Sequence, residues 1–202
     1  MTGVQHARRS AEGRWETGQA TVWWRLGPAP DDETPGAVAR QWVEEIVRTH
    51  RLFSWRGFLA GPAFSKPRFA TIAPADFSIS HSGRTVLVGV AMGGQVGVDV
   101  ETAPFVAFDS ASLRARMLTP LERATLQTLP AEEADSYLAR IWTAKEAHAK
   151  ATGEGQRLDF RLLDVPVLLT ARRQPLEACI AVISDGHRRL LRLALPAHLS
   201  FM

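Results

Sequence analysis

In the segment Val96-Gly97-Val98-Asp99-Val100-Glu101, valine alternates with glycine, aspartate and glutamate. Side chains of a β-strand point alternately to opposite faces, so this pattern predicts a strand with three valines on a buried face. The opposite face then presents Asp99 and Glu101 side by side. Two like charges this close lower stability unless a cation neutralises them, and oxygen ligands suit Mg²⁺ or Mn²⁺ better than zinc. A solvated strand end, where acidic residues are common, stays open as the alternative.

The segments around this strand predict an α+β protein in two similar-sized halves. Residues 1 to about 20 show no period, and Gly93-Gly94 predicts a hairpin turn between the strand before it and the strand after it. A helix start is predicted at Thr119–Glu122, where a Thr cap precedes Pro and Glu. Helical spacing covers residues 36–52 and 131–152, and strands are expected over residues 20–26, 77–79, 85–92, 96–100, 163–170, 177–183 and 189–195.

Composition excludes several classes of protein. The chain has 202 residues, 46% hydrophobic and 22% charged, which is ordinary globular usage. The net charge of +3 permits an acidic partner or a phosphate ligand but is too weak to indicate nucleic-acid binding. No apolar run suggests a membrane span or a secretory signal. Cys179 is the only cysteine, so an internal disulfide and a thiolate-rich metal site are excluded, and we expect a cytoplasmic location.

The three lysines stand out because the other 21 basic residues are arginines. Two of them fall in Trp142-Thr143-Ala144-Lys145-Glu146-Ala147-His148-Ala149-Lys150. Glu146 and Lys150 are one helical turn apart on one face, which alone indicates an ordinary surface pair. Together with Asp99 and Glu101, however, a third carboxylate and two lysines resemble a site for a metal ion and a phosphate.

Two further segments carry polar groups that suit a phosphate. Phe77-Ser78-Ile79-Ser80-His81-Ser82-Gly83 presents two hydroxyls and an imidazole at a strand end, although His81 is equally compatible with a plain loop role. A serine hydrolase is disfavoured because the chain has no Gly-x-Ser-x-Gly motif. In Ser65-Lys66-Pro67 the proline holds the lysine extended. Gly-rich phosphate loops of the Walker or dinucleotide type are absent.

Along the chain these four segments follow the order SKP, FSISHSG, VGVDVE and WTAKEAHAK, and this series resembles the motifs of the surfactin-type 4′-phosphopantetheinyl transferases over roughly residues 36–165. The resemblance implies two pseudo-symmetric halves, residues 1–95 and 96–202, each a helix packed on a small antiparallel sheet. Coenzyme A and Mg²⁺ would bind in the cleft between them. Because the small trimeric carrier synthases are about half this length, the resemblance favours the single-chain type and a monomer.

The resemblance also implies a role for each matching residue. Mg²⁺ would be held by Asp99, Glu101 and Glu146. The adenine pocket would be bordered by Lys66 and Pro67, and the phosphates of coenzyme A would be contacted by Ser80, His81, Lys145 and Lys150. Arg40 would approach the 3′-phosphate. Ser65 stands where the family usually has Gly, the basic N-terminal positions lack a counterpart, and the region after Asp164 matches poorly.

The implied reaction moves phosphopantetheine from coenzyme A to a serine of an apo acyl or peptidyl carrier protein. Glu146 would accept the serine proton and Lys150 would stabilise the departing 3′,5′-ADP. A non-catalytic coenzyme A or carrier binder and a Mg²⁺-dependent phosphohydrolase or nuclease are the alternatives. Residues 112–123, with apolar anchors among arginines, suit an acidic carrier helix or else pack on the protein's own core.

Overall fold

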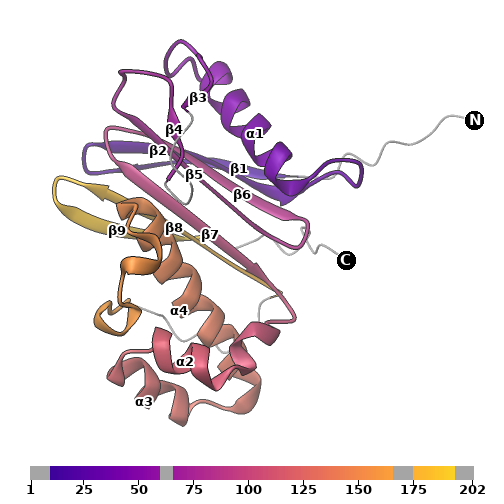
Figure 1. The fold of residues 1–202 in the computed structure, drawn as a ribbon, viewed down its shortest axis with the longest axis vertical. Helices are drawn as coiled ribbons and strands as arrows, with labels where there is room; N and C mark the ends of the chain where they lie inside the picture. Colours follow the sequence, from indigo (N-terminus) through magenta and orange to yellow (C-terminus); the bar gives the residue numbers. More distant parts are fainter. Residues whose placement is uncertain (1–9, 60–65, 166–174, 194–202) are drawn as a thin grey trace, which may run out of the picture.

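The computed structural model describes residues 10–59, 66–165 and 175–193 and shows two large antiparallel sheets (Figure 1). The first sheet has the strand order β1-β2-β6-β5. Its strands are β1 (Ala11–Thr17), β2 (Ala20–Pro28), β5 (Ala75–Ser82) and β6 (Thr85–Met92). Helix α1 (Pro35–Thr49) covers one face through Val38, Val43 and Val47, which pack against alternate residues of β6.

The second sheet has the order β7-β8-β9 and is covered by the longest helix. Its strands are β7 (Gln95–Thr102), β8 (Leu176–Ser184) and β9 (His187–Arg192), and the helix is α4 (Ala131–Thr152). Tyr137, Ile141 and Ala144 of α4 pack on Cys179 and Ala181 of β8. Gly153 ends the helix in the left-handed conformation, as its position after the periodic segment predicts.

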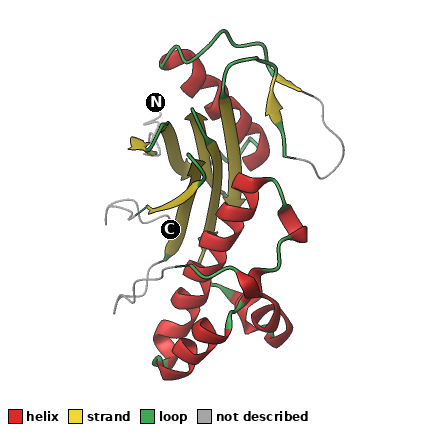
Figure 2. Ribbon diagram, turned by 90° about the vertical axis from the view of Figure 1, so that its left-hand side faces the viewer, coloured by secondary structure: helices red, strands yellow, loops and turns green. Residues whose placement is uncertain are grey.

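The inner faces of the two sheets pack together, so that the layers run helix, sheet, sheet, helix (Figure 2). Val96, Val98 and Val100 of β7 lie fully buried in this central layer, against residues such as Val22 and Leu87 of the first sheet. The prediction from the alternating segment is therefore confirmed: the valines face the core and the acidic residues face the other way, toward α4.

Shorter elements connect these layers. The β3–β4 pair packs beside β5, and the helices α2 and α3 gather at the end of the molecule away from α1 (Figure 1). Thr119 caps α3 in a full capping box with Glu122, as predicted. The bounds of these elements are β3 (Phe58–Leu59), β4 (Arg68–Phe69), α2 (Ala111–Met117), α3 (Pro120–Thr128) and the 3-10 turns Val106–Asp109, Gly155–Arg157 and Phe160–Leu162.

Three expectations about local structure were wrong, of which the first two concern residues 11–17 and the Gly93-Gly94 turn. Residues 11–17 form β1, which escaped notice because its polar and charged residues lie on an edge strand that is only partly buried. Gly93-Gly94 does not close a hairpin. β6 pairs with β2 and β5, and β7 pairs with β8, so these glycines carry the chain from one sheet to the other. Local composition marks a turn but does not specify which strands pair across it.

The predicted strand over residues 163–170 is not formed in its described part, since Phe160–Leu162 is a 3-10 turn and residues 163–165 are not paired; residues 166–170 lie outside the described part. The strand expected over residues 189–195 is formed as far as Arg192, and residues 194–195 lie outside the described part. The remaining predicted helices and strands are confirmed, as is the α+β class. The pseudo-symmetry and the division at residue 95 stay predictions. Within the described ranges, the helices are too short or too polar to cross a membrane.

Candidate active site where the two sheets meet

Short polar side chains of β5 bind the backbone of β7 along the line where the two sheets meet. Alternate residues of β5 accept hydrogen bonds from β7 amides that lie twenty positions further along the chain. The pairs are Asp76 with Val96 N at 2.7 Å, Ser78 with Val98 N at 3.0 Å and Ser82 with Thr102 N at 3.1 Å. These contacts, here called the β5–β7 seam, satisfy amide donors that β8 does not reach.

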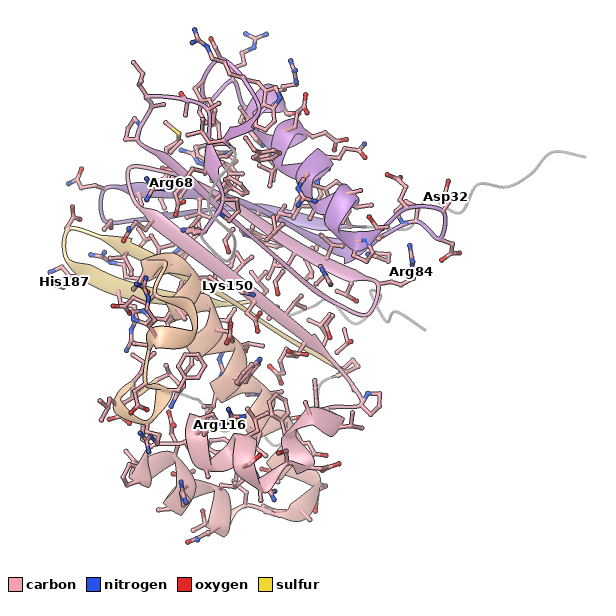
Figure 3. All side chains as sticks on the ribbon, viewed as in Figure 1. Asp32, Arg68, Arg84, Arg116, Lys150 and His187 are labelled. Atoms are coloured by element: carbon pink, nitrogen blue, oxygen red, sulfur yellow. The ribbon has the colours of Figure 1, made fainter. Side chains whose placement is uncertain are left out.

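Gly97 lets α4 approach β7 closely. A Cβ atom built on Gly97 would lie 1.8 Å from the carbonyl oxygen of Ala147 and 2.4 Å from the amide nitrogen of Ala151. Only a residue without a side chain permits this spacing. The close approach brings the α4 residues Glu146 and Lys150 to the acidic face of β7 (Lys150 is labelled in Figure 3).

Asp99 is the centre of the resulting cluster. It is 4% exposed, and its Oδ1 accepts hydrogen bonds from Lys150 Nζ at 2.6 Å and from Ser80 Oγ at 2.8 Å. Lys150 Nζ also lies 3.1 Å from Ser80 Oγ. The second oxygen, Oδ2, is buried without a hydrogen-bond partner among the described residues. A buried carboxylate oxygen in this state is costly, and burial raises the pKa of Asp99 against the opposing effect of Lys150.

Glu101 and Glu146 belong to the same electrostatic cluster. Burial raises the pKa of Glu101, and the neighbouring Asp99 raises it further, while hydrogen bonds from Ser82 and Trp142 lower it. The pKa of Glu146 is raised by burial and by Asp99 and Glu101, against the opposing effect of Lys150. Three carboxylates therefore share one ammonium group, which leaves two negative charges uncompensated within the cluster.

The residues present fit a divalent cation. All the donors are oxygens, the unmatched charge is that of one Mg²⁺ or Mn²⁺, and Asp99 Oδ2 lacks a partner. Among the described residues, no three acidic, histidine or cysteine side chains stand close enough to hold a metal as they are placed. Binding would thus require the carboxylates to close on the ion, and Lys150, whose side chain is 30% exposed, to leave Asp99.

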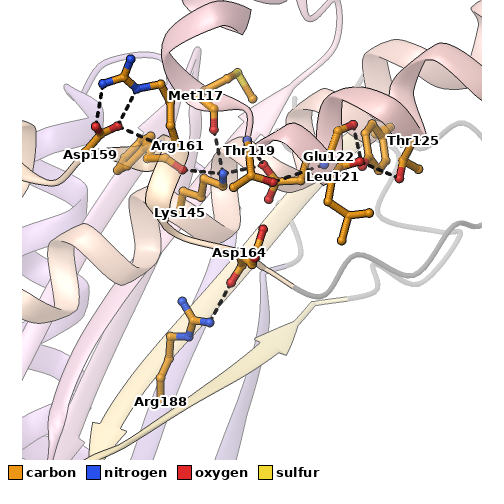
Figure 4. A network of polar contacts seen from close by, with 12 residues as sticks. Met117, Thr119, Leu121, Glu122, Thr125, Lys145, Asp159, Arg161, Asp164 and Arg188 are labelled. Carbon is orange, nitrogen blue, oxygen red and sulfur yellow. Dashed lines mark hydrogen bonds and ion pairs between the residues drawn. The ribbon is translucent and has the colours of Figure 1, made fainter.

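Lys145 does not join this cluster, although the sequence places it in the same motif. Its side chain is 0% exposed. Its Nζ donates to Glu122 Oε2 at 2.6 Å and to the carbonyl oxygens of Met117 and Phe160, each at 2.7 Å (Figure 4). All three ammonium protons are thus used inside the protein, so the expected contact with a coenzyme A phosphate is not supported here.

The remaining residues predicted for the coenzyme A site are dispersed. Lys66 binds Asp76 and donates to Val96 O at 2.8 Å, so it is tied to the β5–β7 seam next to the exposed Pro67; Ser65 lies outside the described residues. His81 follows Ser80 on β5, points to the opposite face and is exposed.

Arg40 also lies apart from the carboxylate cluster. It is on the exposed side of α1 and donates to Gly36 O at 3.1 Å. Since α1 covers the outer face of the first sheet and α4 covers the outer face of the second, both sheets lie between these two helices. The structure therefore brings together Ser80, Asp99, Glu101, Glu146 and Lys150, and leaves Arg40 and His81 outside the contacts among them.

Sequence reasoning passed over Ser82, Trp142 and Gly97 as site residues. The serine is visible in hindsight as one member of the alternation Ser78, Ser80, Ser82 on β5. The glycine is the one residue without a side chain on the acidic face of β7. The indole contact with Glu101 had no signal in the sequence, because it depends on how α4 lies on the sheet.

An open cavity of about 710 Å³ adjoins the cluster. Glu146 and Trp142 line one part of it, and Arg116, Arg157 and Arg161 line another, together with apolar side chains of α2. Of the three carboxylates it reaches Glu146, and it opens along the surface formed by α2 and the 3-10 turns after α4. Arg116 is labelled in Figure 3.

Comparison with known proteins assigns the chain to a family. Residues 95–190 match the model of the 4′-phosphopantetheinyl transferase superfamily. The chain is 39% identical to the 4′-phosphopantetheinyl transferase HetI of Nostoc sp. over 79 residues, which is 39% of this chain and 33% of that protein. It is 30% identical to Sfp of Bacillus subtilis over 47% of this chain and 41% of Sfp.

The match to a shorter relative is more extensive. Over 131 residues the chain is 34% identical to the 4′-phosphopantetheinyl transferase AcpT of Salmonella typhimurium, which is 63% of this chain and 68% of AcpT. The alignment with HetI spans only about a third of that protein. The matched region contains β7 and α4, which carry the three carboxylates. The chain belongs to the 4′-phosphopantetheinyl transferase superfamily.

Proposed function

We propose that this protein transfers the 4′-phosphopantetheine arm of coenzyme A to a serine of an apo carrier protein and releases 3′,5′-ADP. The observation that carries the proposal is the electrostatic cluster of the buried Asp99 and the partly buried Glu101 and Glu146, in which Lys150 is bound to Asp99. Family membership and the printed names of the relatives support the same reaction.

In the proposed reaction the serine oxygen of the carrier attacks the β-phosphorus of coenzyme A, and the bond from that phosphorus to the ADP oxygen breaks. Asp99, Glu101 and Glu146 would hold Mg²⁺ or Mn²⁺. The chemistry that this ion supplies when bound is neutralisation of the charge on the pyrophosphate. Glu146, which lies at the edge of the cluster and lines the adjoining cavity, accepts the serine proton. Lys150 binds the phosphate of the departing 3′,5′-ADP.

Lys150 is placed for that role because its side chain is partly exposed at the edge of the cluster. Its present partners, Asp99 Oδ1 and Ser80 Oγ, are atoms that a metal ion and a phosphate would engage instead. We therefore propose Ser80 as a phosphate contact. Lys66 and Pro67 stay proposals for the border of the adenine pocket, as do Arg40 and His81 for phosphate contacts.

One assay separates the proposed function from its rivals. The protein is incubated with an apo carrier, coenzyme A and Mg²⁺, and the carrier is weighed by mass spectrometry. A mass gain of one phosphopantetheine supports transfer. Coenzyme A binding without a gain indicates a non-catalytic binder, and phosphate release without carrier indicates a phosphohydrolase.

The role of Glu146 is tested by Glu146→Gln, with Glu132→Gln in the exposed first turn of α4 as the matched control. We expect the first variant to lose transfer by about a hundredfold or more while keeping its melting temperature, and the second to behave as wild type. Full activity of Glu146→Gln would remove its assigned role.

The carrier surface is proposed to lie on α2 and the turns after α4. Residues 112–123 cover most of α2, the turn at Leu118–Thr119 and the start of α3, and Leu121 is exposed. The cavity beside Glu146 is lined by Arg116 and Arg157, and also by Arg161 in an ion pair with Asp159. The positive charge of Arg116 and Arg157 suits an acidic partner that delivers its serine there. Arg116→Glu should raise the apparent KM for the carrier without changing that for coenzyme A, whereas Arg48→Glu on α1 should change neither.

We also propose that the chain is of the surfactin type and acts as a monomer. The support is that β5, β7 and α4 of a single chain supply every residue of the carboxylate cluster. The cytoplasmic location rests on the sequence alone. Sedimentation of the active protein tests the monomer, because a trimer would contradict it.

A further inference from the structure

Ser82 differs from the other residues of the β5–β7 seam in the use of its hydroxyl group. Its Oγ accepts a hydrogen bond from Thr102 N at 3.1 Å, as a seam residue should. Its proton is directed to Glu101 Oε2, also at 3.1 Å. Thr102 Oγ1 lies 3.1 Å from Ser82 Oγ and can donate to it, so the one donor and the two acceptor positions of the Ser82 hydroxyl are all engaged.

Ser78 lies four residues before Ser82 on the same face of β5, and its contacts differ from those of Ser82. Its Oγ accepts from Val98 N at 3.0 Å, which is the equivalent seam contact. The described contacts of Ser78 include none with a carboxylate. Ser78 and Ser82 therefore share the structural role of joining the sheets, and only Ser82 adds a contact with a candidate metal ligand.

We propose that Ser82 is a positioning residue that orients the Glu101 carboxylate toward the divalent cation. Glu101 sits near the end of β7, at the rim of the buried layer, where its side chain is less enclosed than that of Asp99. The hydroxyl from β5 and the Trp142 indole from α4 reach it from two different elements. Such outer contacts fix the direction of a metal-binding carboxylate before the ion arrives.

This inference rests on the proposed function, since Glu101 is a ligand only if the site holds a metal ion. It assigns to Ser82 a role different from direct contact with a phosphate. A phosphate contact would act only when coenzyme A is present, whereas a positioning contact acts on the metal alone. Metal binding in the absence of coenzyme A therefore distinguishes the two roles.

The experiment measures Mn²⁺ binding to the full chain, without coenzyme A, from the loss of the free-ion electron paramagnetic resonance signal. Ser82→Ala is compared with Ser78→Ala, which removes an equivalent seam contact. We expect Ser82→Ala to weaken Mn²⁺ binding about tenfold or more, and Ser78→Ala to change it less than about twofold. Melting temperatures of the two variants report the shared structural loss.

A second pair keeps the test valid if Ser82→Ala folds poorly. Ser82→Thr retains the hydroxyl, and Ser82→Val has the shape of threonine without a hydroxyl. The difference in Mn²⁺ affinity between these two variants therefore reports the contribution of the hydroxyl. Equal Mn²⁺ affinities for Thr and Val, or equal losses for Ser82→Ala and Ser78→Ala, would overturn the positioning role. If the positioning role fails in this way but wild-type protein from the same preparations still transfers phosphopantetheine, the proposed function stands. Wild-type protein that neither binds Mn²⁺ nor transfers would overturn both.

Discussion

Substitution of Lys145 by Met tests whether this lysine contacts a phosphate, as the motif suggests, or forms a buried structural ion pair, as the fold indicates. The motif suggests a phosphate contact, whereas the fold buries the side chain completely and gives its ammonium three oxygen partners. Methionine keeps the length and most of the volume of lysine but donates no hydrogen bond. The variant would leave Glu122 as a buried carboxylate without its cation.

The expected loss of stability follows from that geometry. Removing one partner of a buried ion pair lowers the free energy of unfolding by about 3–5 kcal/mol. Here the carbonyl groups of Met117 and Phe160 also lose a hydrogen-bond donor. Glu122 Oε1 already lacks a hydrogen-bond partner among the described residues, so little can compensate. For a chain of this length each kcal/mol shifts the melting temperature by about 2–4 °C. We expect a decrease of about 10 °C.

Urea unfolding followed by the fluorescence of the six tryptophans provides the measurement. Arg123→Met, at an exposed position of α3, is the matched control and should change stability by less than about 0.5 kcal/mol. The double variant Lys145→Met/Glu122→Gln should recover at least about 1 kcal/mol, because Gln is uncharged yet can still accept from Thr119 N in the capping box. Coenzyme A binding should persist where the variant is folded. Unchanged stability with lost coenzyme A binding would refute the structural role and restore the phosphate contact.

Two other predictions concern the core. Gly97→Ala should destabilise the protein by about 1–3 kcal/mol, because the added Cβ must push α4 away from β7, and it should reduce transfer by displacing Glu146 and Lys150. Gly36→Ala in the first turn of α1 serves as a near-neutral control. Wild-type activity and stability in Gly97→Ala would contradict the close approach of α4 to β7. Burial raises the pKa of Cys179 to about 12, so little thiolate forms at pH 8. A disulfide reagent should therefore react with the native protein only as it unfolds, but at once in denaturant. Stoichiometric reaction with the native protein within seconds would show that β8 is not buried as described.

Much of the candidate site follows from strand and helix periods alone. The alternation from Val96 to Glu101 predicts which side chains are buried and that the two carboxylates share a face, and both features are present in the structure. The spacing of Glu146 and Lys150 predicts that they act together, and both lie against Asp99. Local periodicity is sufficient here because each pair belongs to one element.

Lys145 shows where a motif misleads and which signal could have corrected it. Adjacent helical residues differ in direction by about 100°, so Lys145 and Glu146 cannot face the same way. Lys145 lies one turn after Ile141 and beside Ala144, both of which pack in the core. Its burial was therefore indicated by the helix period, but the partners that make burial tolerable come from α2, α3 and the turn after α4, which no local pattern identifies.

The β5–β7 seam could not be predicted, and its irregularity is what makes the site. Strands in a regular ladder lie about 4.7–4.9 Å apart and satisfy one another's backbone. Here β7 takes hydrogen bonds on one side from β8 and on the other from side chains of β5. Because the contacts run from side chain to backbone, the hydroxyls of Ser80 and Ser82 lie at the level of Asp99 and Glu101 and reach their carboxylates. A continuous ladder would have turned those serines to the faces of one sheet, away from the acidic pair. The break in strand pairing therefore supplies the polar contacts that make a buried cluster of three carboxylates tolerable until a cation binds.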